Sequence, residues 1–192
     1  MKEQELQPWL IRMSQGDESA FRFVYEATRE HAYRLIYYLA PDKDDAADLM
    51  SEVYMALLNG IGGYKPELPF HSWFNGLIVR QVRNWKRRGW QRFRILDKVK
   101  SMLRTTADRS MESYAETLGV REELARALHA LPQKQREVIV LRYYQDYALE
   151  EISRLLRIPI GTVKSRHHHA LKQLRGSFEQ RGESREDTNY VY

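Results

Sequence analysis

Apolar residues recur along most of this chain at intervals of three and four positions, the spacing that places them on one face of an α-helix. The alternation of apolar and polar residues that is typical of strands is almost absent. The stripes predict helices over 5–13, 17–40 and 44–58, and Asp17 is suited to cap the second of them. We expect the following side chains to face inward: Leu6, Trp9, Leu10, Met13, Phe21, Val24, Tyr25, Ala32, Leu35, Ile36, Leu39, Ala47, Met50, Tyr54 and Leu57.

A loop is predicted over 59–70, because this segment holds three Gly and two Pro. It is unusual for a loop in also carrying Ile61, Tyr64 and Leu68. The following segment, 70–88, has a helical pattern that starts with aromatic residues and ends with cationic ones.

Further helices are predicted over 120–130, 133–145, 148–156 and 160–176. Residues 89–119, between these two sets of helices, lack a regular stripe of apolar residues, and the C-terminal residues 177–192 include few apolar ones. We therefore predict an all-α fold of two small helical domains joined by a basic linker, the C-terminal domain being a helix-turn-helix. The expected boundaries are 1–90 and 120–177 for the domains, 91–119 for the linker and 178–192 for a flexible tail.

The most specific pattern lies at 147–175, where a short amphipathic helix, a tight turn and a second helix follow one another. The turn is predicted at Ile158-Pro159-Ile160-Gly161, with Thr162 capping the second helix. One face of that helix is apolar, and the rest carries hydrogen-bond donors without any acid from Glu151 to Glu179. Such a face suits the major groove of DNA. The alternative is an ordinary antiparallel helix pair with a solvated basic face.

Three consecutive histidines, His167 to His169, raise the question of a metal site. Adjacent helical residues point about 100° apart, whereas zinc sites on a helix use i, i+3 or i, i+4 spacing. We therefore expect no metal, with His167 at the edge of the core and the other two facing the groove. DNA affinity is then expected to rise as the pH falls through the histidine range.

The net charge of +5 over 192 residues is unevenly distributed. Residues 1–79 carry 7 basic and 12 acidic residues, 80–109 carry 11 and 2, and 110–192 carry 13 and 12. A block with a charge of +9 indicates a polyanionic partner such as nucleic acid, the alternative being a merely basic solvated linker.

Several classes of protein are excluded by composition. The chain has no Cys, which excludes disulfides, thiolate metal sites and a cysteine nucleophile. It has no run of 18 apolar residues, and its N-terminal stretch is polar, so we expect no membrane insertion, no secretory signal and a cytoplasmic location. The glycines at 60–63 lack the Lys and Ser/Thr of a P-loop, and no zinc pair or nucleophile elbow occurs. We expect no enzyme activity and no cofactor.

Two sets of motifs carry a resemblance to a known family. The second half contains TVKSRHHHALKQL and LPQKQREVIVLRYYQDYALEEISRLL, and the first half contains, in order, GDESAFRFVYEATREHAYRLI, DDAADLMSEVYMALL and FHSWFNGLIVRQVRNWKRR. They are similar to the C-terminal DNA-binding domain and to the first domain, respectively, of the sigma-70 family of bacterial RNA polymerase sigma factors, the extracytoplasmic-function (ECF) group in particular. Ser51, Arg80, Asn84 and His169 differ from the residues that many members carry.

The resemblance implies three groups of functional residues. The helix at 44–58 corresponds to the segment that docks on core polymerase, through Asp45, Asp48, Leu49 and Glu52. The loop and helix at 59–88 correspond to the part that reads the −10 element as single-stranded DNA, through Tyr64, Phe70, His71, Trp73, Arg80, Arg83, Asn84 and Arg87. The second helix of the C-terminal motif corresponds to the reader of the −35 duplex, through Thr162, Lys164, Ser165, Arg166, His168, His169 and Lys172.

The function implied is that of an ECF sigma factor, which binds core polymerase and directs promoter-specific initiation. Its expected partners are core polymerase, promoter DNA and an anti-sigma factor. The alternative is a stand-alone helix-turn-helix regulator that binds duplex DNA without polymerase. The acidic first half and the aromatic loop favour the sigma factor, because a duplex repressor needs no surface for stacking single bases.

Overall fold

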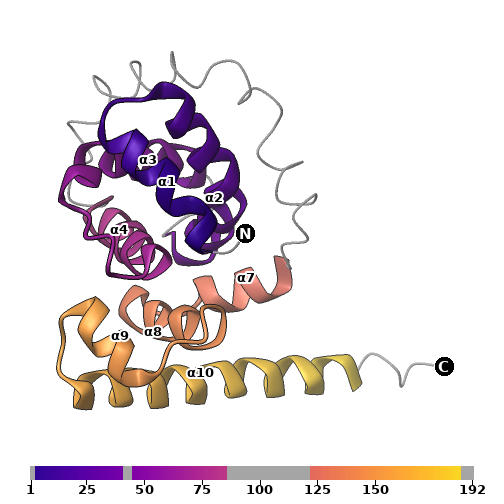
Figure 1. Cartoon of the computed structure of the whole chain (residues 1–192). Coiled ribbons are helices and arrows are strands. Elements are labelled where there is room, and N and C mark those ends of the chain that lie inside the picture. The colour runs from indigo at the N-terminus through magenta and orange to yellow at the C-terminus, as the bar shows by residue number, and fades with distance from the viewer. Residues whose placement is uncertain (1–2, 41–44, 86–121, 187–192) are drawn as a thin grey trace. The chain divides into compact units, whose positions relative to one another are not determined.

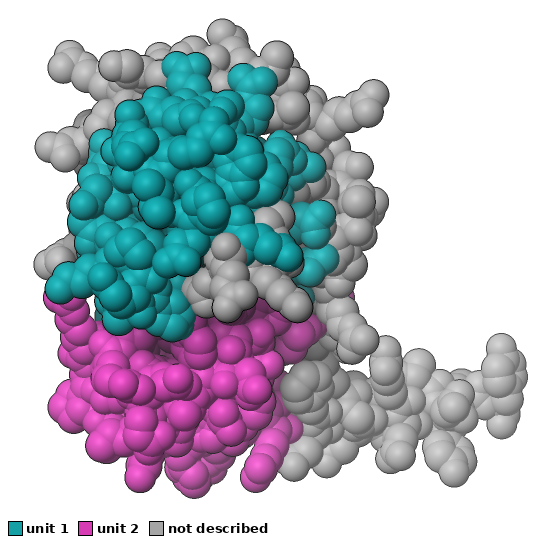
Figure 2. All heavy atoms as spheres, in the orientation of Figure 1, with its two compact units in different colours: residues 1–120 teal, residues 121–192 magenta. Residues whose placement is uncertain are grey.

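The computed structural model describes residues 3–40, 45–85 and 122–186, and no strand occurs among them (Figure 1). The chain divides into two compact units, residues 1–120 and 121–192 (Figure 2). The predicted all-α fold with two helical domains is therefore confirmed. The linker predicted at 91–119 lies outside the described residues, so its boundaries stay a prediction.

Four helices and a short 3-10 helix make up the described part of unit 1. They are α1 (Glu3–Ser14), α2 (Glu18–Leu39), α3 (Ala46–Gly60), η2 (Ile61–Gly63) and α4 (Phe70–Trp85). Helix α2 packs against α1, α3 and α4, and α3 packs against α4. The longest helix of the unit thus lies between the others, and its buried stripe, from Ala20 to Leu39, supplies much of the core.

Asp17 caps α2 as predicted. Its Oδ1 accepts hydrogen bonds from the backbone N–H groups of Ser19 and Ala20, at 2.8 and 3.1 Å. The Ser19 hydroxyl and the Arg12 guanidinium also donate to this carboxylate. The Ser19 hydroxyl, followed by Arg12, lowers the pKa of Asp17 far below its usual range, because both favour the charged form. The cap fixes the turn between α1 and α2.

A buried hydrogen-bond chain crosses the core of unit 1 from α2 to α3. The Thr28 hydroxyl donates to the Val24 carbonyl oxygen at 2.7 Å and lies 2.8 Å from the Tyr54 hydroxyl. Since Thr28 has one proton and a carbonyl only accepts, Tyr54 is the donor to Thr28. Both polar groups are thereby satisfied in a site without solvent, where an unpaired one would cost about 1–3 kcal/mol.

Four helices make up the described part of unit 2. They are α7 (Glu122–His129), α8 (Gln133–Tyr143), α9 (Leu149–Leu156) and α10 (Ile160–Glu186). Helix α10 packs against α7, α8 and α9. Arg136 is buried in this unit, and its Nη2 donates to the carbonyl oxygens of His129 and Leu131, which closes the turn between α7 and α8.

Two features differ from the predicted helices. Ala47 is exposed, while Ala46, Leu49 and Val53 are buried with Tyr54 and Leu57, so the inward face of α3 was predicted one position out of phase at its start. Helix α10 continues to Glu186, ten residues beyond its predicted end at residue 176. The segment 177–186 contains no Pro and is rich in Glu, Gln and Arg, which favour helix without any apolar stripe.

Candidate nucleic-acid interface

The turn between α9 and α10 has the geometry of a helix-turn-helix. Arg157 ends α9 in the left-handed region, with φ of 53°. The Ser153 hydroxyl donates to the Ile158 carbonyl oxygen at 2.6 Å, and the Ile158 N–H donates to the Ser153 carbonyl oxygen at 3.1 Å. This pair of hydrogen bonds holds the turn to the end of the preceding helix.

Helix α10 starts at Ile160, as predicted, but its first turn is capped differently from the prediction. The N–H groups of Thr162 and Val163 donate to the Pro159 carbonyl oxygen, at 2.9 and 3.2 Å. The prediction that Thr162 caps this helix is therefore wrong, and Thr162 lies in its first turn. Proline is suited to a helix start because its missing N–H would have no partner there.

The apolar side of α10 sets the direction of its other side. Val163 and Ala170 are fully buried, and they face a core that includes Ile152 and Leu156 of α9. Tyr143 of α8 stacks on His167 with ring centroids 5.7 Å apart. Burial, followed by the charges of Arg142 and His168, lowers the pKa of His167, which disfavours the charged form of this ring.

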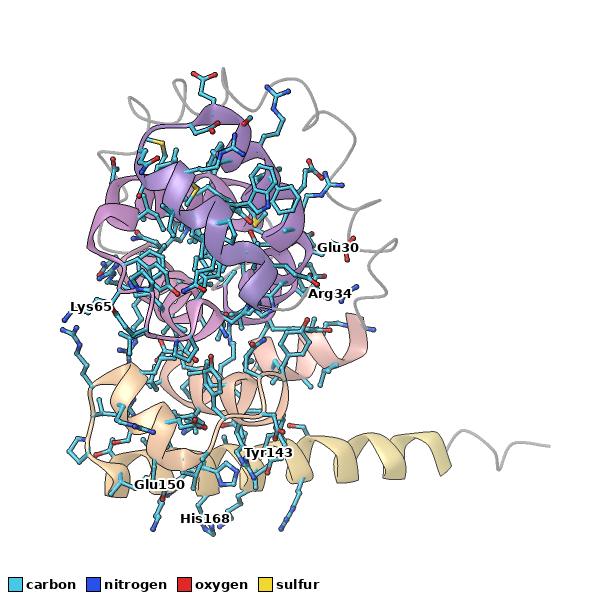
Figure 3. All side chains as sticks on the ribbon, in the orientation of Figure 1. Glu30, Arg34, Lys65, Tyr143, Glu150 and His168 are labelled. Carbon is cyan, nitrogen blue, oxygen red and sulfur yellow. The ribbon has the colours of Figure 1, made fainter. Side chains whose placement is uncertain are left out.

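The opposite side of α10 carries the predicted DNA-binding residues. Lys164, Ser165, His168, His169 and Lys172 are all exposed. Figure 3 shows His168 projecting from α10 away from the other helices of unit 2. Thr162 and Arg166 are half-buried at the margin of this surface. The seven residues thus share one helix, and the exposed ones form a face of hydrogen-bond donors and hydroxyl groups.

In unit 1, the loop after η2 is held by an aromatic cluster. The Tyr64 ring lies 5.3 Å from the Trp73 ring and 5.7 Å from the Phe70 ring, measured between centroids. The Tyr64 hydroxyl donates to the Leu68 carbonyl oxygen at 2.7 Å. From α1, Gln7 Nε2 donates to the Pro66 carbonyl oxygen at 3.1 Å. The loop is therefore fastened at both sides, and Leu68 at its end is 52% exposed.

Only some of the residues predicted to bind the −10 element are exposed to solvent. Phe70 is fully buried and stacks on Phe74, with centroids 5.5 Å apart, so it cannot offer its face to a base as expected. The reason is its place at the first turn of α4, where it fills the core below the loop. Tyr64, His71, Trp73, Arg83 and Asn84 are half-exposed, and Arg80 is exposed. Arg87 lies outside the described residues.

The acidic candidates for polymerase docking lie along α3 and its start. Asp45, Asp48 and Glu52 are half-exposed and spaced for one helix face. Leu49, expected in the same group, is fully buried and belongs to the core. Ser51 is also buried, and its hydroxyl faces the Ala47 carbonyl oxygen at 3.4 Å, so this position presents no polar group to a partner.

Three residues that hold these surfaces were not predicted from the sequence: Gln7, Tyr143 and Ser153. A polar side chain that bonds to a distant backbone carbonyl leaves no periodic signal. Tyr143 precedes the helix-turn-helix pattern and Ser153 lies in its first helix, so this pattern is the one feature that pointed toward them. Within the described ranges, no helix is long and apolar enough to cross a membrane. Among the same residues, no three acidic or histidine side chains gather as a metal site would require.

Comparison with known proteins gives the same order of domains. The family model "Sigma-70 region 2" matches residues 24–92, and "Sigma-70, region 4" matches residues 127–176. The chain is 27% identical over 172 residues to the ECF RNA polymerase sigma factor SigX of Bacillus subtilis, covering 84% of this chain and 85% of SigX. It is 30% identical over 165 residues to the ECF sigma factor SigE of Mycolicibacterium smegmatis, covering 83% of this chain and 63% of SigE.

Solved structures share the fold. CnrH, solved in complex with the cytosolic domain of CnrY, has a TM-score of 0.60 at 17% identity, over 91% of this chain and 97% of CnrH. The sigma factor RpoE of Bartonella quintana, solved with the anti-sigma factor NepR, has a TM-score of 0.58 at 16% identity, over 83% of this chain and 96% of RpoE.

Two helical DNA-binding regions in this order define a promoter-specificity subunit of bacterial RNA polymerase. The protein belongs to the sigma-70 family, and its relatives place it in the ECF group. An ECF sigma factor binds core polymerase and directs promoter-specific initiation. The same matches support this function rather than that of a stand-alone regulator.

Proposed function

We propose that the two units of this sigma factor divide promoter recognition between them. Unit 2 reads the −35 duplex with the exposed face of α10, from Thr162 to Lys172. The observation that carries this assignment is that face itself, in which Lys164, Ser165, His168, His169 and Lys172 are exposed and no acid intervenes. Cationic and hydroxyl groups on a helix that follows a tight turn suit base edges and flanking phosphates.

Unit 1 captures the −10 element as single-stranded DNA through the loop and the adjacent face of α4. Tyr64 and Trp73 supply half-exposed aromatic surface for an unstacked base, and Arg80 and Arg83 supply charge for phosphates. Because Phe70 is buried, it acts as the support on which Tyr64 and Trp73 pack. The same unit docks on core polymerase through Asp45, Asp48 and Glu52.

The proposed linker, 91–119, carries six of the eleven basic residues of the 80–109 block and connects the two readers. A segment with this charge suits contact with the nucleic acid or with acidic polymerase surfaces. The two domains are proposed at 1–90 and 120–177.

We further propose an anti-sigma partner for this chain, supported by the solved RpoE–NepR complex and by the shared fold. The protein acts as a DNA-binding subunit and performs no catalysis of its own.

The test is to mix the purified chain with bacterial core polymerase, measure co-elution, and transcribe a library of promoter fragments. We expect a stable complex and transcripts that start downstream of a shared pair of sequence elements. Failure to co-elute with core polymerase, together with tight binding of duplex DNA by the chain alone, would contradict the proposal and favour a stand-alone regulator.

A further inference from the structure

The ring of His169 is held in one orientation on the exposed face of α10. Its Nδ1 lies 2.7 Å from the backbone carbonyl oxygen of Ser165, one turn earlier in the helix. The Ser165 hydroxyl oxygen is further away, at 3.4 Å from the same nitrogen. The stronger contact is thus with the backbone, which every residue at position 165 would supply.

This contact decides which ring nitrogen carries the proton. A carbonyl oxygen accepts hydrogen bonds and cannot donate them, so Nδ1 of His169 must be the N–H donor. A neutral imidazole has one N–H group, and its other nitrogen keeps a lone pair. Nε2 of neutral His169 is therefore an acceptor, on a face where Lys164 and Lys172 only donate.

We propose that His169 is a specificity-determining residue, which accepts a hydrogen bond at Nε2 from the exocyclic amino group of one base in the −35 duplex. In the major groove the amino groups are adenine N6 and cytosine N4, whereas guanine N7 and O6 and thymine O4 accept. An acceptor at Nε2 selects the amino-bearing base on the strand it faces, because two lone pairs repel. This inference rests on the proposed role of α10.

A phosphate contact suits this nitrogen poorly. Phosphate oxygens also only accept, so they would need a donor that neutral Nε2 lacks. The lysines on the same face are the natural phosphate partners, since an ammonium group offers three donors and no acceptor. His169 is therefore matched to a base edge, and its substitution is expected to alter sequence preference as well as affinity.

The first experiment measures base preference with the full chain bound to core polymerase. A pool of duplexes randomised over the −35 element is selected at about pH 8, where histidine is ordinarily neutral. The wild-type chain is expected to select adenine or cytosine at one position. His169→Ala should lose that preference, and His169→Arg should change it to guanine, the usual partner of arginine. An unchanged preference in His169→Ala overturns the inference.

The second experiment removes the amino group from the DNA. The selected base is replaced by an analogue that lacks the amino group: purine for adenine, or 2-pyrimidinone for cytosine. Testing both analogues shows which of the two bases donates to His169. The wild-type chain should lose about tenfold in affinity, near the low end for a base-edge contact, and His169→Ala should lose nothing further. His168→Ala should retain the discrimination. An equal loss in wild type and His169→Ala overturns the inference.

The third experiment tests the protonated nitrogen without DNA. Long-range ¹H–¹⁵N NMR of the full chain at about pH 8 should show His169 as the Nδ1–H form. Ser165→Ala removes the hydroxyl but keeps the carbonyl, so the same form should persist. An Nε2–H form in the wild-type chain overturns the inference. If only the co-elution with core polymerase failed, the proposed function would fall while this measurement stood.

Discussion

Tyr143 of α8 lies against His167 of α10, with the ring planes at 21° and the Tyr143 hydroxyl 3.1 Å from His167 Nε2. The contact joins the helix before the helix-turn-helix to its second helix. His167 directly precedes the exposed His168, so the position of the DNA-facing surface depends on how this ring is held. Tyr143 itself is 61% exposed and lies at the margin of that surface.

Tyr143→Ala is expected to destabilise unit 2 by about 0.5–1.5 kcal/mol, the contribution of an aromatic pair. Tyr143→Phe keeps the ring, loses the hydrogen bond, and should show a smaller loss. All four Trp residues lie at positions 9, 73, 85 and 90, so Trp fluorescence follows unit 1 and backbone amide NMR in urea is needed for unit 2. Equal stabilities of wild type and Tyr143→Ala would show that the contact contributes nothing.

Acidification is expected to weaken unit 1 through His31. Burial is the main cause that lowers the pKa of His31 from its ordinary 6.5, with His71 and Arg34 adding to it and the hydrogen bond to Asn75 opposing it. The folded state then stays unprotonated while the unfolded chain takes up a proton. Stability is therefore full above pH 6.5 and falls as the pH drops from there toward the lowered folded-state value.

The measurement for His31 is urea unfolding followed by Trp fluorescence at about pH 7.5 and about pH 5.5, on either side of the ordinary histidine range. His31→Gln stays neutral at both values, and its amide can still bond to Asn75. We expect the variant to lose less stability on acidification than wild type. The same loss in both proteins would mean that another group carries the pH dependence.

Lys164→Ala is expected to weaken binding to the −35 duplex by about 1–3 kcal/mol if the side chain reaches a base, and to reduce the salt dependence by about one ion if it reaches a phosphate. Fluorescence anisotropy with a short −35 duplex at several salt concentrations measures both effects. The matched control is Lys65→Ala, which removes the same charge from the loop of unit 1. An equal effect of the two substitutions would point to nonspecific attraction.

Tyr64→Ala is expected to impair strand opening while leaving −35 duplex binding intact, because it removes both a half-exposed ring and the support of the loop. Tyr64→Phe keeps the ring and loses the hydrogen bond to the Leu68 carbonyl oxygen, so it separates stacking surface from loop support. The rate of opening by the holoenzyme is read with a fluorescent base at −10. If Tyr64→Ala and Lys164→Ala impaired the same step of initiation, the proposed division of promoter recognition between the two units would be wrong.

Periodicity predicted the helices well, since Leu6, Leu10 and Met13 are buried as expected, and Val163 and Ala170 bury the predicted apolar face of α10. The prediction was weakest for residue types that occur both in cores and on binding surfaces. Phe70 and Leu49 suit either a binding surface or a core, and only packing against neighbouring helices decides between them. Ala47 was wrongly predicted to be buried for a similar reason, because a short side chain at a helix start says little about which face of the helix is buried.

The candidate interface also has one part that the sequence predicts and another part that it does not. The exposed face of α10 follows from the apolar stripe, since burying one side of a helix leaves the other side outward. The contacts that hold the two surfaces are long-range and have no sequence signature: Tyr143 contacts His167 of α10 in unit 2, and Gln7 holds the loop of unit 1 at Pro66. The start of α10 at Ile160 was predicted, but its cap was assigned to Thr162 because that side chain suits a cap, whereas the Pro159 carbonyl oxygen accepts from the first-turn N–H groups.

Permanganate footprinting of thymines at −10, on a promoter taken from the transcribed library, tests whether this chain opens DNA as a subunit of polymerase. The chain together with core polymerase is expected to make these thymines reactive, and neither component alone should do so. Reactivity that is absent from the complete mixture, with tight sequence-specific duplex binding by the chain alone, would show that the chain is a stand-alone regulator and not a sigma factor.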